Sequence, residues 1–165
     1  MIHTIQIIYN RLYQANPRSH TYDDWDSAQV MRLLNEKSKI DPKEDIYREL
    51  ILKISQLKTK TITQSFIERF CLAKLSEAIL EEYPVNVAEA YVLAYITLNK
   101  PTDINGMYLK LGTSGLLGPT LINGEMISDI EAVAKFIITS LQEAELLIIV
   151  EDRWLKPGKN LILMN

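Results

Sequence analysis

Side chains that could act as nucleophiles or proton carriers near neutral pH are few and scattered in this chain. It holds two histidines, His3 and His20, and a single cysteine, Cys71. Neither histidine has a cysteine, serine or carboxylate beside it in a known nucleophile pattern, so an acid–base site would need a cleft that brings one of them to Asp23 or Asp24. Cys71 stands in an apolar stretch, where a thiol is more often a small core residue than a nucleophile. We therefore expect a protein that is not an enzyme.

Two further groupings have part of a ligand-binding pattern: the acidic cluster Asp23, Asp24 and Asp26, and the glycines Gly112, Gly115 and Gly118. The acidic cluster lacks the glycine turn and the final glutamate of a calcium loop, and it suits the start of a helix. The glycines have the spacing of a phosphate cradle, but no strand is expected before them and no Lys-Ser or Lys-Thr pair follows them. The sequence thus predicts no bound metal, no cofactor and a surface loop over residues 112–124.

Composition and charge are those of an ordinary globular protein. The 165 residues fit one domain or two small ones that share a core, and 47% of them are apolar and 24% charged. A net charge of -3 gives the chain no general attraction for nucleic acid or anionic lipid. The single cysteine excludes an internal disulfide, and we recognise neither a secretion signal nor an apolar stretch of membrane-spanning length. We expect a cytoplasmic protein without membrane contact.

The N-terminal region, residues 1–83, is predicted to form a bundle of about four helices, because apolar residues recur there at three- and four-residue spacing. The expected helices run from Ile2 to Tyr13, from the acidic cluster onward with Trp25, Met31 and Leu34 buried, from Asp41 to Leu57, and from Thr63 to Tyr83. Asp41 and Pro42 suit the start of the third helix, and a Lys-Thr-Lys-Thr connector follows it. Pro84 disfavours helix before it and marks the boundary between the two halves.

The C-terminal region, residues 84–165, is predicted to hold three helices, a loop and a hairpin. Asn86 and Glu89 form a capping pair for a helix that runs to Leu98, and a short helix is expected from Asp103 to Leu111. Ser128 and Glu131 form a second capping pair, for a helix that runs to Glu145. Two strands are expected at 146–150 and 161–164. The residues from Lys156 to Asn160 would form the turn between these strands. The whole chain is therefore expected to be mainly α, as an α+β protein.

This order of elements over residues 86–165 resembles the winged helix-turn-helix fold, in which a two-stranded wing follows the third helix. The matching segments are residues 87–98, 103–111, 128–145 and the hairpin 146–165 with its tip around 154–159, about half of the chain. The resemblance implies DNA binding, with the third helix in the major groove and the wing on a phosphate or in the minor groove.

The charges of the expected third helix argue against that use. It carries Asp129, Glu131, Glu143 and Glu145 against Lys135 alone, so phosphates would repel it. The glycine-rich insertion also departs from the tight turn of a DNA-reading unit. We therefore expect a non-catalytic interaction module, an adaptor or subunit of a larger assembly, that binds a protein partner or a second copy of itself.

Two sets of residues are candidates for the binding surface. For protein binding the apolar anchors would be Tyr91, Tyr95, Leu146 and Trp154, since aromatic anchors supply much of the binding energy at interfaces. The alternative is a DNA-binding regulator that places Arg153, Lys156 and Lys159 on the phosphate backbone. Neighbouring acidic residues cancel most of that positive charge, which favours protein binding.

Overall fold

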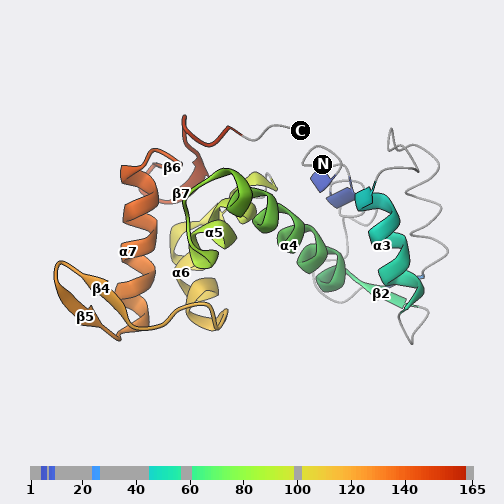
Figure 1. Cartoon of the computed structure of the whole chain (residues 1–165), viewed down its shortest axis with the longest axis horizontal. Coiled ribbons are helices and arrows are strands. Elements are labelled where there is room, and N and C mark those ends of the chain that lie inside the picture. The colour runs from blue at the N-terminus through green and yellow to red at the C-terminus, as the bar shows by residue number, and fades with distance from the viewer. Residues whose placement is uncertain are drawn as a thin grey trace. The chain divides into compact units, whose positions relative to one another are not determined.

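The computed structural model describes residues 5–6, 8–9, 24–26, 45–56, 61–98 and 102–162 (Figure 1). The chain is an α+β protein that forms two compact units, Met1–Leu75 with Asn165 and Ser76–Met164. The division between the units falls inside helix α4 (Gln64–Glu82), whereas the boundary expected at Pro84 lies just after that helix. Each unit has a core of its own among the described residues.

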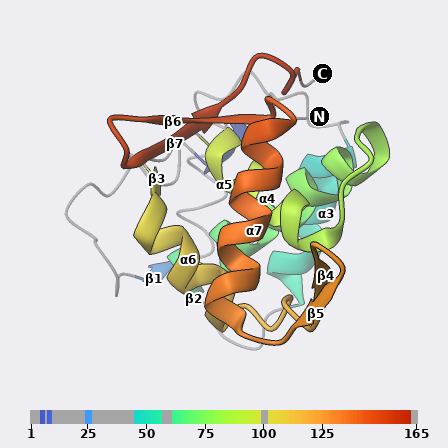
Figure 2. The same ribbon diagram turned by 90° about the vertical axis from the view of Figure 1, so that its left-hand side faces the viewer.

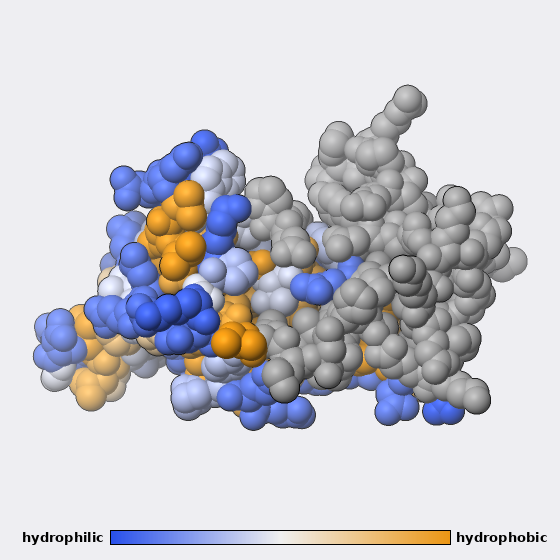
Figure 3. Space-filling view, turned by 90° about the horizontal axis from the view of Figure 1, so that it is seen from above, coloured by the Kyte–Doolittle hydropathy of each residue, from blue (hydrophilic) through white to orange (hydrophobic). Residues whose placement is uncertain are grey.

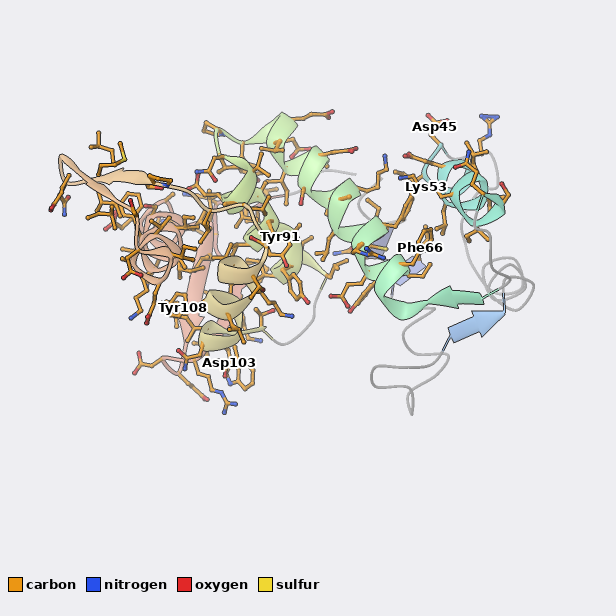
Figure 4. The ribbon with its side chains drawn as sticks, turned by 90° about the horizontal axis from the view of Figure 1, so that it is seen from below. Asp45, Lys53, Phe66, Tyr91, Asp103 and Tyr108 are labelled. Atoms are coloured by element: carbon orange, nitrogen blue, oxygen red, sulfur yellow. The ribbon has the colours of Figure 1, made fainter. Side chains whose placement is uncertain are left out.

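In the first unit, helix α3 (Asp45–Ser55) and the beginning of α4 bury apolar stripes, and the backbone at residues 5–6 and 8–9 is also helical. The buried side chains are Ile5, Ile8, Tyr9, Ile46, Leu50, Ile54, Ile67, Phe70, Cys71, Leu72 and Leu75. The Lys74 ammonium pairs with Glu49 at 2.6 Å. The ammonium of Lys53, which is labelled in Figure 4, lies 5.8 Å from the ring centroid of Phe70. The long basic side chains therefore cover the edge of this core.

The predicted N-terminal bundle of four helices is not supported, because Asp24 and Asp26 of the acidic cluster lie in a strand rather than in the first turn of a helix. Strand β1 (Asp24–Asp26) pairs antiparallel with strand β2 (Thr61–Thr63), with Trp25 opposite Ile62. The β-branched side chains of β2 favour extended backbone, and a partner strand then satisfies the hydrogen-bonding groups of β1. Met31 and Leu34 lie outside the described residues, as do the predicted starts of the first and third helices. The predicted limits of α4, directly after Thr63 and before Tyr83, are confirmed.

In the second unit, which begins inside α4, three further helices pack against a small antiparallel sheet (Figure 2). Its elements are α5 (Val87–Thr97), β3 (Thr102–Asp103), α6 (Ile104–Thr113), β4 (Thr120–Ile122), β5 (Glu125–Ile127), α7 (Ile130–Glu143), β6 (Leu147–Val150) and β7 (Trp154–Pro157). The three-stranded sheet has the order β3-β7-β6, and β4 with β5 forms a separate hairpin. Helix α5 is buried along nearly its whole length, so it is the central element of this core.

Side-chain caps define the helix starts of this unit. The side-chain oxygen of Asn86 accepts from the Glu89 amide at 2.8 Å and the Glu89 carboxylate accepts from the Asn86 amide at 3.0 Å, which confirms the predicted capping box. Asp103 caps α6 as predicted, accepting from the amide of Asn105 at 2.8 Å. For α7 the predicted cap Ser128 is wrong by one residue. Asp129 takes the position, and its carboxylate accepts from the Glu131 amide.

The C-terminal hairpin is confirmed, but its predicted turn and second strand are wrong. The turn lies at residues 151–153, where Glu151 and Asp152 have φ angles of 56° and 55° and the Arg153 amide donates to Val150 O at 3.1 Å. The second strand is β7 rather than residues 161–164, of which 161–162 are not a strand and the rest lie outside the described part. Leu155 is buried on the sheet, which sets the register, and Pro157 ends the ladder because it has no amide hydrogen.

The glycine-rich segment is not the plain loop that was predicted. It contains the hairpin β4–β5, whose turn residues Asn123 and Gly124 have φ angles of 51° and 80°. Two successive positive φ angles at Asn-Gly are those of a type I′ turn, whose twist matches that of the flanking strands. The insertion between α6 and α7 is therefore a short ordered arm.

Candidate protein-binding site

A groove of about 460 Å³ lies where α6 meets the first turn of α7. It is lined by Asn105, Tyr108, Leu109, Gly112, Thr113, Ile130 and Glu131. Leu109 is 71% exposed and Ile130 is 46% exposed, although both are large aliphatic residues. Such exposure of neighbouring apolar side chains is typical of a surface that binds another molecule.

The walls of the groove are held by specific contacts. Asp103 fixes the first turn of α6, and Tyr108 extends from that helix towards α7 (Figure 4). On α7 the Lys135 ammonium pairs with Glu131 at 3.2 Å and lies 5.9 Å from the ring centroid of Tyr108. The one cation at this wall is therefore already engaged by an acidic and an aromatic side chain. The lining of the groove contains one acidic residue, Glu131, and no basic one.

The hairpin β4–β5 joins the two walls of the groove and has an apolar outer face. Leu121 and Met126 are directly opposite each other in the ladder, so they share one face, and each is 61% exposed. The other face carries Ile122 and Ile127, which are half-buried. In the space-filling view, hydrophobic residues lie beside hydrophilic ones at the end of the second unit where this hairpin projects (Figure 3).

The segment that runs from the end of α6 through most of the hairpin carries no charge. Residues 111–124 contain neither an acidic nor a basic side chain, in a chain of which 24% is charged. Much of this segment is exposed, including Leu116 and Leu121. Depletion of charge together with exposed apolar side chains is the compositional mark of the centre of a protein–protein interface.

Of the four predicted protein-binding anchors, two are buried and two are on the surface. Tyr95 is 3% exposed and Leu146 is 7% exposed, so both side chains belong to the core. Tyr91 is half-buried, with its ring 5.8 Å from that of Tyr95, and Trp154 is half-buried at the base of the hairpin turn. Burial thus corrects the prediction for Tyr95 and Leu146, while the role of Tyr91 and Trp154 stays a prediction.

The three basic residues proposed for DNA contact are not gathered at the hairpin tip. Arg153 donates from Nε to Asp103 Oδ2 at 2.7 Å, and its guanidinium lies 4.5 Å from the ring centroid of Trp154. Lys159 pairs with Glu145 at 3.1 Å, beyond the end of the second strand. Lys156 is exposed and has no ion pair among the described residues. The tip itself is formed by two acidic residues and Arg153.

The contact between Asp103 and Arg153 ties the start of α6 to the hairpin turn. The Ile104 amide also donates to Arg153 O at 2.8 Å, so side chain and backbone join the same two segments. Hydrogen bonding from Arg153 is the main cause that lowers the pKa of Asp103, and the amides of Asn105 and Gly106 add to it. One carboxylate therefore caps a helix and anchors the hairpin turn.

The opposite end of the β6–β7 hairpin is fixed to the end of α7. Glu145 has a φ of 58°, the Glu145 amide donates to Gln142 O and the Leu146 amide donates to Leu141 O, which together make a Schellman motif. The chain after β7 then binds the two carbonyl groups that follow the helix: the Gly158 amide donates to Leu146 O and the Asn160 amide donates to Glu145 O. Any Cβ at position 158 would overlap the Glu145 carbonyl, so the glycine is required there.

Groups that could carry catalysis are not brought together in the described residues. Cys71 is buried, its thiol faces Ile5 O at 4.0 Å, and burial raises its pKa to about 12, with the charge of Glu68 as a smaller cause. Among the residues that the structure describes, no three His, Cys, Asp or Glu side chains are grouped as a metal site requires. His3, His20 and Asp23 lie outside these residues. The helices in the described ranges are too short or too polar to cross a membrane.

Comparisons with known proteins give no family for this chain. No protein-family model matches it, no curated protein matches it, and no solved structure matches it. Its function must therefore be inferred from the site itself.

The residues of the groove and the outer face of the hairpin were not predicted as a binding site. Leu109, Leu121, Met126 and Ile130 look like ordinary apolar residues in the sequence, and only the fold reveals that they are exposed. The uncharged stretch 111–124 was the signal that could have drawn attention to them. The glycines of the same stretch predict a loop, and this prediction conceals the signal.

Proposed function

We propose that the second unit is a winged-helix module that binds protein rather than nucleic acid, as an adaptor or subunit of a larger assembly. Support for the winged-helix relation comes from the order of its elements: three helices, then a two-stranded hairpin directly after the third helix. A short strand between the first two helices completes the sheet in the order β3-β7-β6.

The observation that carries the proposal is the chemistry of the surface that a winged helix would turn towards DNA. The first turn of α7 has Asp129 and Glu131, and the hairpin tip has Glu151 and Asp152. Lys135, the cation of this helix, is paired with Glu131. Phosphate binding needs an excess of positive charge, and this surface instead combines acidic residues with exposed aliphatic ones.

A titration of the full chain against labelled random duplex DNA tests this proposal. Fluorescence anisotropy would be recorded at about 20 mM and about 150 mM salt, since contacts to phosphates weaken steeply between these values. We expect no saturable binding at either salt concentration. Saturable binding at low salt that is lost at the higher one would contradict protein binding as the function of this module.

DNA binding is the second candidate, and one observation favours it. Lys156 is exposed and unengaged within the described residues, two positions after Trp154 on the same strand. If DNA is bound through the hairpin, Lys156→Glu should weaken binding and reduce its salt dependence, because one phosphate contact is lost. The control is Lys110→Glu on α6, outside the hairpin.

A further inference from the structure

We propose that the occupant of the groove is a second copy of this chain, with the β4–β5 hairpin of each copy lying against the groove of the other. This inference rests on the proposed protein-binding function and names its partner. The interface consists of the groove residues Leu109 and Ile130, the hairpin residues Leu121 and Met126, and Leu116 in the segment that leads into the hairpin.

The hairpin is an arm that lacks support on one face within its own chain. Its sheet has only the two strands β4 and β5, each of three residues. Two-stranded hairpins are marginal in water unless a face packs against something else. Here the inner face is half-buried, but the outer face with Leu121 and Met126 is 61% exposed at both residues. A partner that covers this face supplies the missing contact.

The charge of the surface selects among partners. A highly charged partner, such as a basic peptide or a nucleic acid, would gain nothing from residues 111–124, because they contain no charge. Two copies of a chain with a net charge of -3 repel each other unless they meet through uncharged surface. Leu116 and Leu121 lie in this uncharged segment, while Met126 and Ile130 adjoin Glu125 and Glu131.

The arrangement of arm and groove is self-complementary. The residues 114–129 that carry the hairpin connect the last turn of α6 to the first turn of α7, and these two turns are walls of the groove. Projecting arm and apolar recess therefore occur at the same end of one protomer. A two-fold axis beside them lets each copy give its arm and receive that of the other, as in the reciprocal contacts of a closed dimer.

The apolar area available is sufficient for a specific contact. The five interface residues are exposed by 40 to 71%. At about 100 Å² each they supply about 500 Å² from one copy, and the pair supplies about 1,000 Å², the lower size of a specific protein interface. A weak, concentration-dependent dimer is what such an area supports.

Sedimentation velocity of the full chain over a concentration series tests the proposal. We expect a shift from monomer to dimer as the concentration rises to about 100 µM. Leu121→Lys on the hairpin and Leu109→Glu in the groove should each raise the dimer dissociation constant at least about tenfold, because each places a charge in an apolar contact. Leu52→Lys, at a leucine on α3 that is 57% exposed, is the matched control and should leave the constant unchanged.

Mixing the two variants gives the sharpest readout. In a mixed dimer one contact joins Lys at position 121 to Glu at position 109, and the other contact is unaltered. The mixture should therefore recover most of the association that each variant alone has lost. Recovery of this kind requires that the hairpin of one copy meets the groove of the other, and a misfolded variant would not produce it.

Two outcomes would overturn the second copy as partner. One is a chain that stays monomeric throughout the concentration series, and the other is a dimer that neither variant weakens. In either case the absence of DNA binding would leave the proposed protein-binding function standing with a different protein as partner. Salt-dependent DNA binding by the wild-type chain would remove the proposed function itself.

Discussion

The β6–β7 hairpin and the β4–β5 hairpin belong to the same unit, and both turn through residues with positive φ, but only the first is built into the core. It buries Leu155, gains β3 as a third strand, and is held at its turn by Asp103 and at its other end by Gly158. The β4–β5 hairpin has two short strands and an exposed outer face. The comparison teaches that the turn residues determine where a hairpin forms. The packing of its two faces determines whether the hairpin stabilises the fold or leaves a surface for binding.

The largest effect should come from Gly158→Ala, which breaks the attachment of β6–β7 to the end of α7. A Cβ there overlaps the Glu145 carbonyl and approaches the Leu146 carbonyl carbon to 2.9 Å. We expect the free energy of unfolding, measured in urea, to fall by about 3 kcal/mol or more. Gly118→Ala is the control, since a Cβ at Gly118 meets nothing within 4 Å. Equal stability of the two variants would refute the role assigned to Gly158.

A smaller effect is expected from Tyr83→Phe, which removes the support of the chain that follows β7. The Tyr83 hydroxyl donates to Ile162 O and accepts from the Ile162 amide, both at 2.6 Å. Loss of these bonds should cost about 1 kcal/mol of unfolding free energy in urea. Tyr108→Phe is the matched control, because its hydroxyl has no hydrogen-bond partner among the described residues. A loss of the same size in both variants would contradict this account.

Removal of the ion pair between Asp103 and Arg153 at the hairpin turn should lower the stability of the fold by an amount that depends on pH. Asparagine at position 103 keeps the helix cap but removes the charge that pairs with Arg153. The pKa of Asp103 is lowered from 3.8 on folding, so its charge stabilises the fold above that value, and this stabilisation is lost as the pH falls through the lower folded pKa. The stability difference between wild type and Asp103→Asn, followed by thermal unfolding, should be full above pH 3.8 and shrink below it. A difference that does not change with pH would exclude the ion pair as its cause.

The smallest effect on folding should come from the outer face of β4–β5. The double variant Leu121→Ser with Met126→Ser alters two exposed side chains, so the unfolding free energy at low protein concentration should change by less than about 0.5 kcal/mol. Urea unfolding would be compared with that of Leu155→Ala, whose buried side chain should cost about 2 to 5 kcal/mol. A large loss in the double variant would mean that this hairpin belongs to the core after all.

The helices of the second unit could be predicted because their starts carry local signals. Asn86 with Glu89 and Asp103 are capping residues whose partners lie within three positions in the chain, so no tertiary information is needed. The strand at Asp24 could not be found in this way. Its partner β2 lies more than thirty residues away, and three acidic residues near one another suit a helix start equally well.

The two turns show a different limit. Pro157-Gly158 is a strong turn signal, but this glycine is needed for close backbone approach to Glu145 rather than for a hairpin turn. The true hairpin turn uses Glu151 and Asp152 in the left-handed region, where non-glycine residues are uncommon. Asn123-Gly124, with the apolar pairs Leu121-Ile122 before it and Met126-Ile127 after it, is a hairpin signal in the sequence that the neighbouring glycines obscure.

Of the candidate site, the sequence predicted the unit but not the surface. Tyr95 and Leu146 are predicted as apolar anchors of an interface, but an apolar side chain suits a core as readily as a binding surface. The exposure of Leu109 and Ile130 depends on how two helices meet across an inserted arm. The sequence alone therefore does not reveal that these two side chains are exposed.

Helix α4 belongs to both compact units, since the division between them falls inside it. A protease needs extended, accessible backbone at the bond that it cuts, and the hydrogen-bonded turns of a helix do not provide it. Limited proteolysis should therefore not release the second unit at residue 75. Truncation at that point would remove the first turns of α4 and leave the rest of the helix without a natural cap, so the two units are best expressed and studied as one chain.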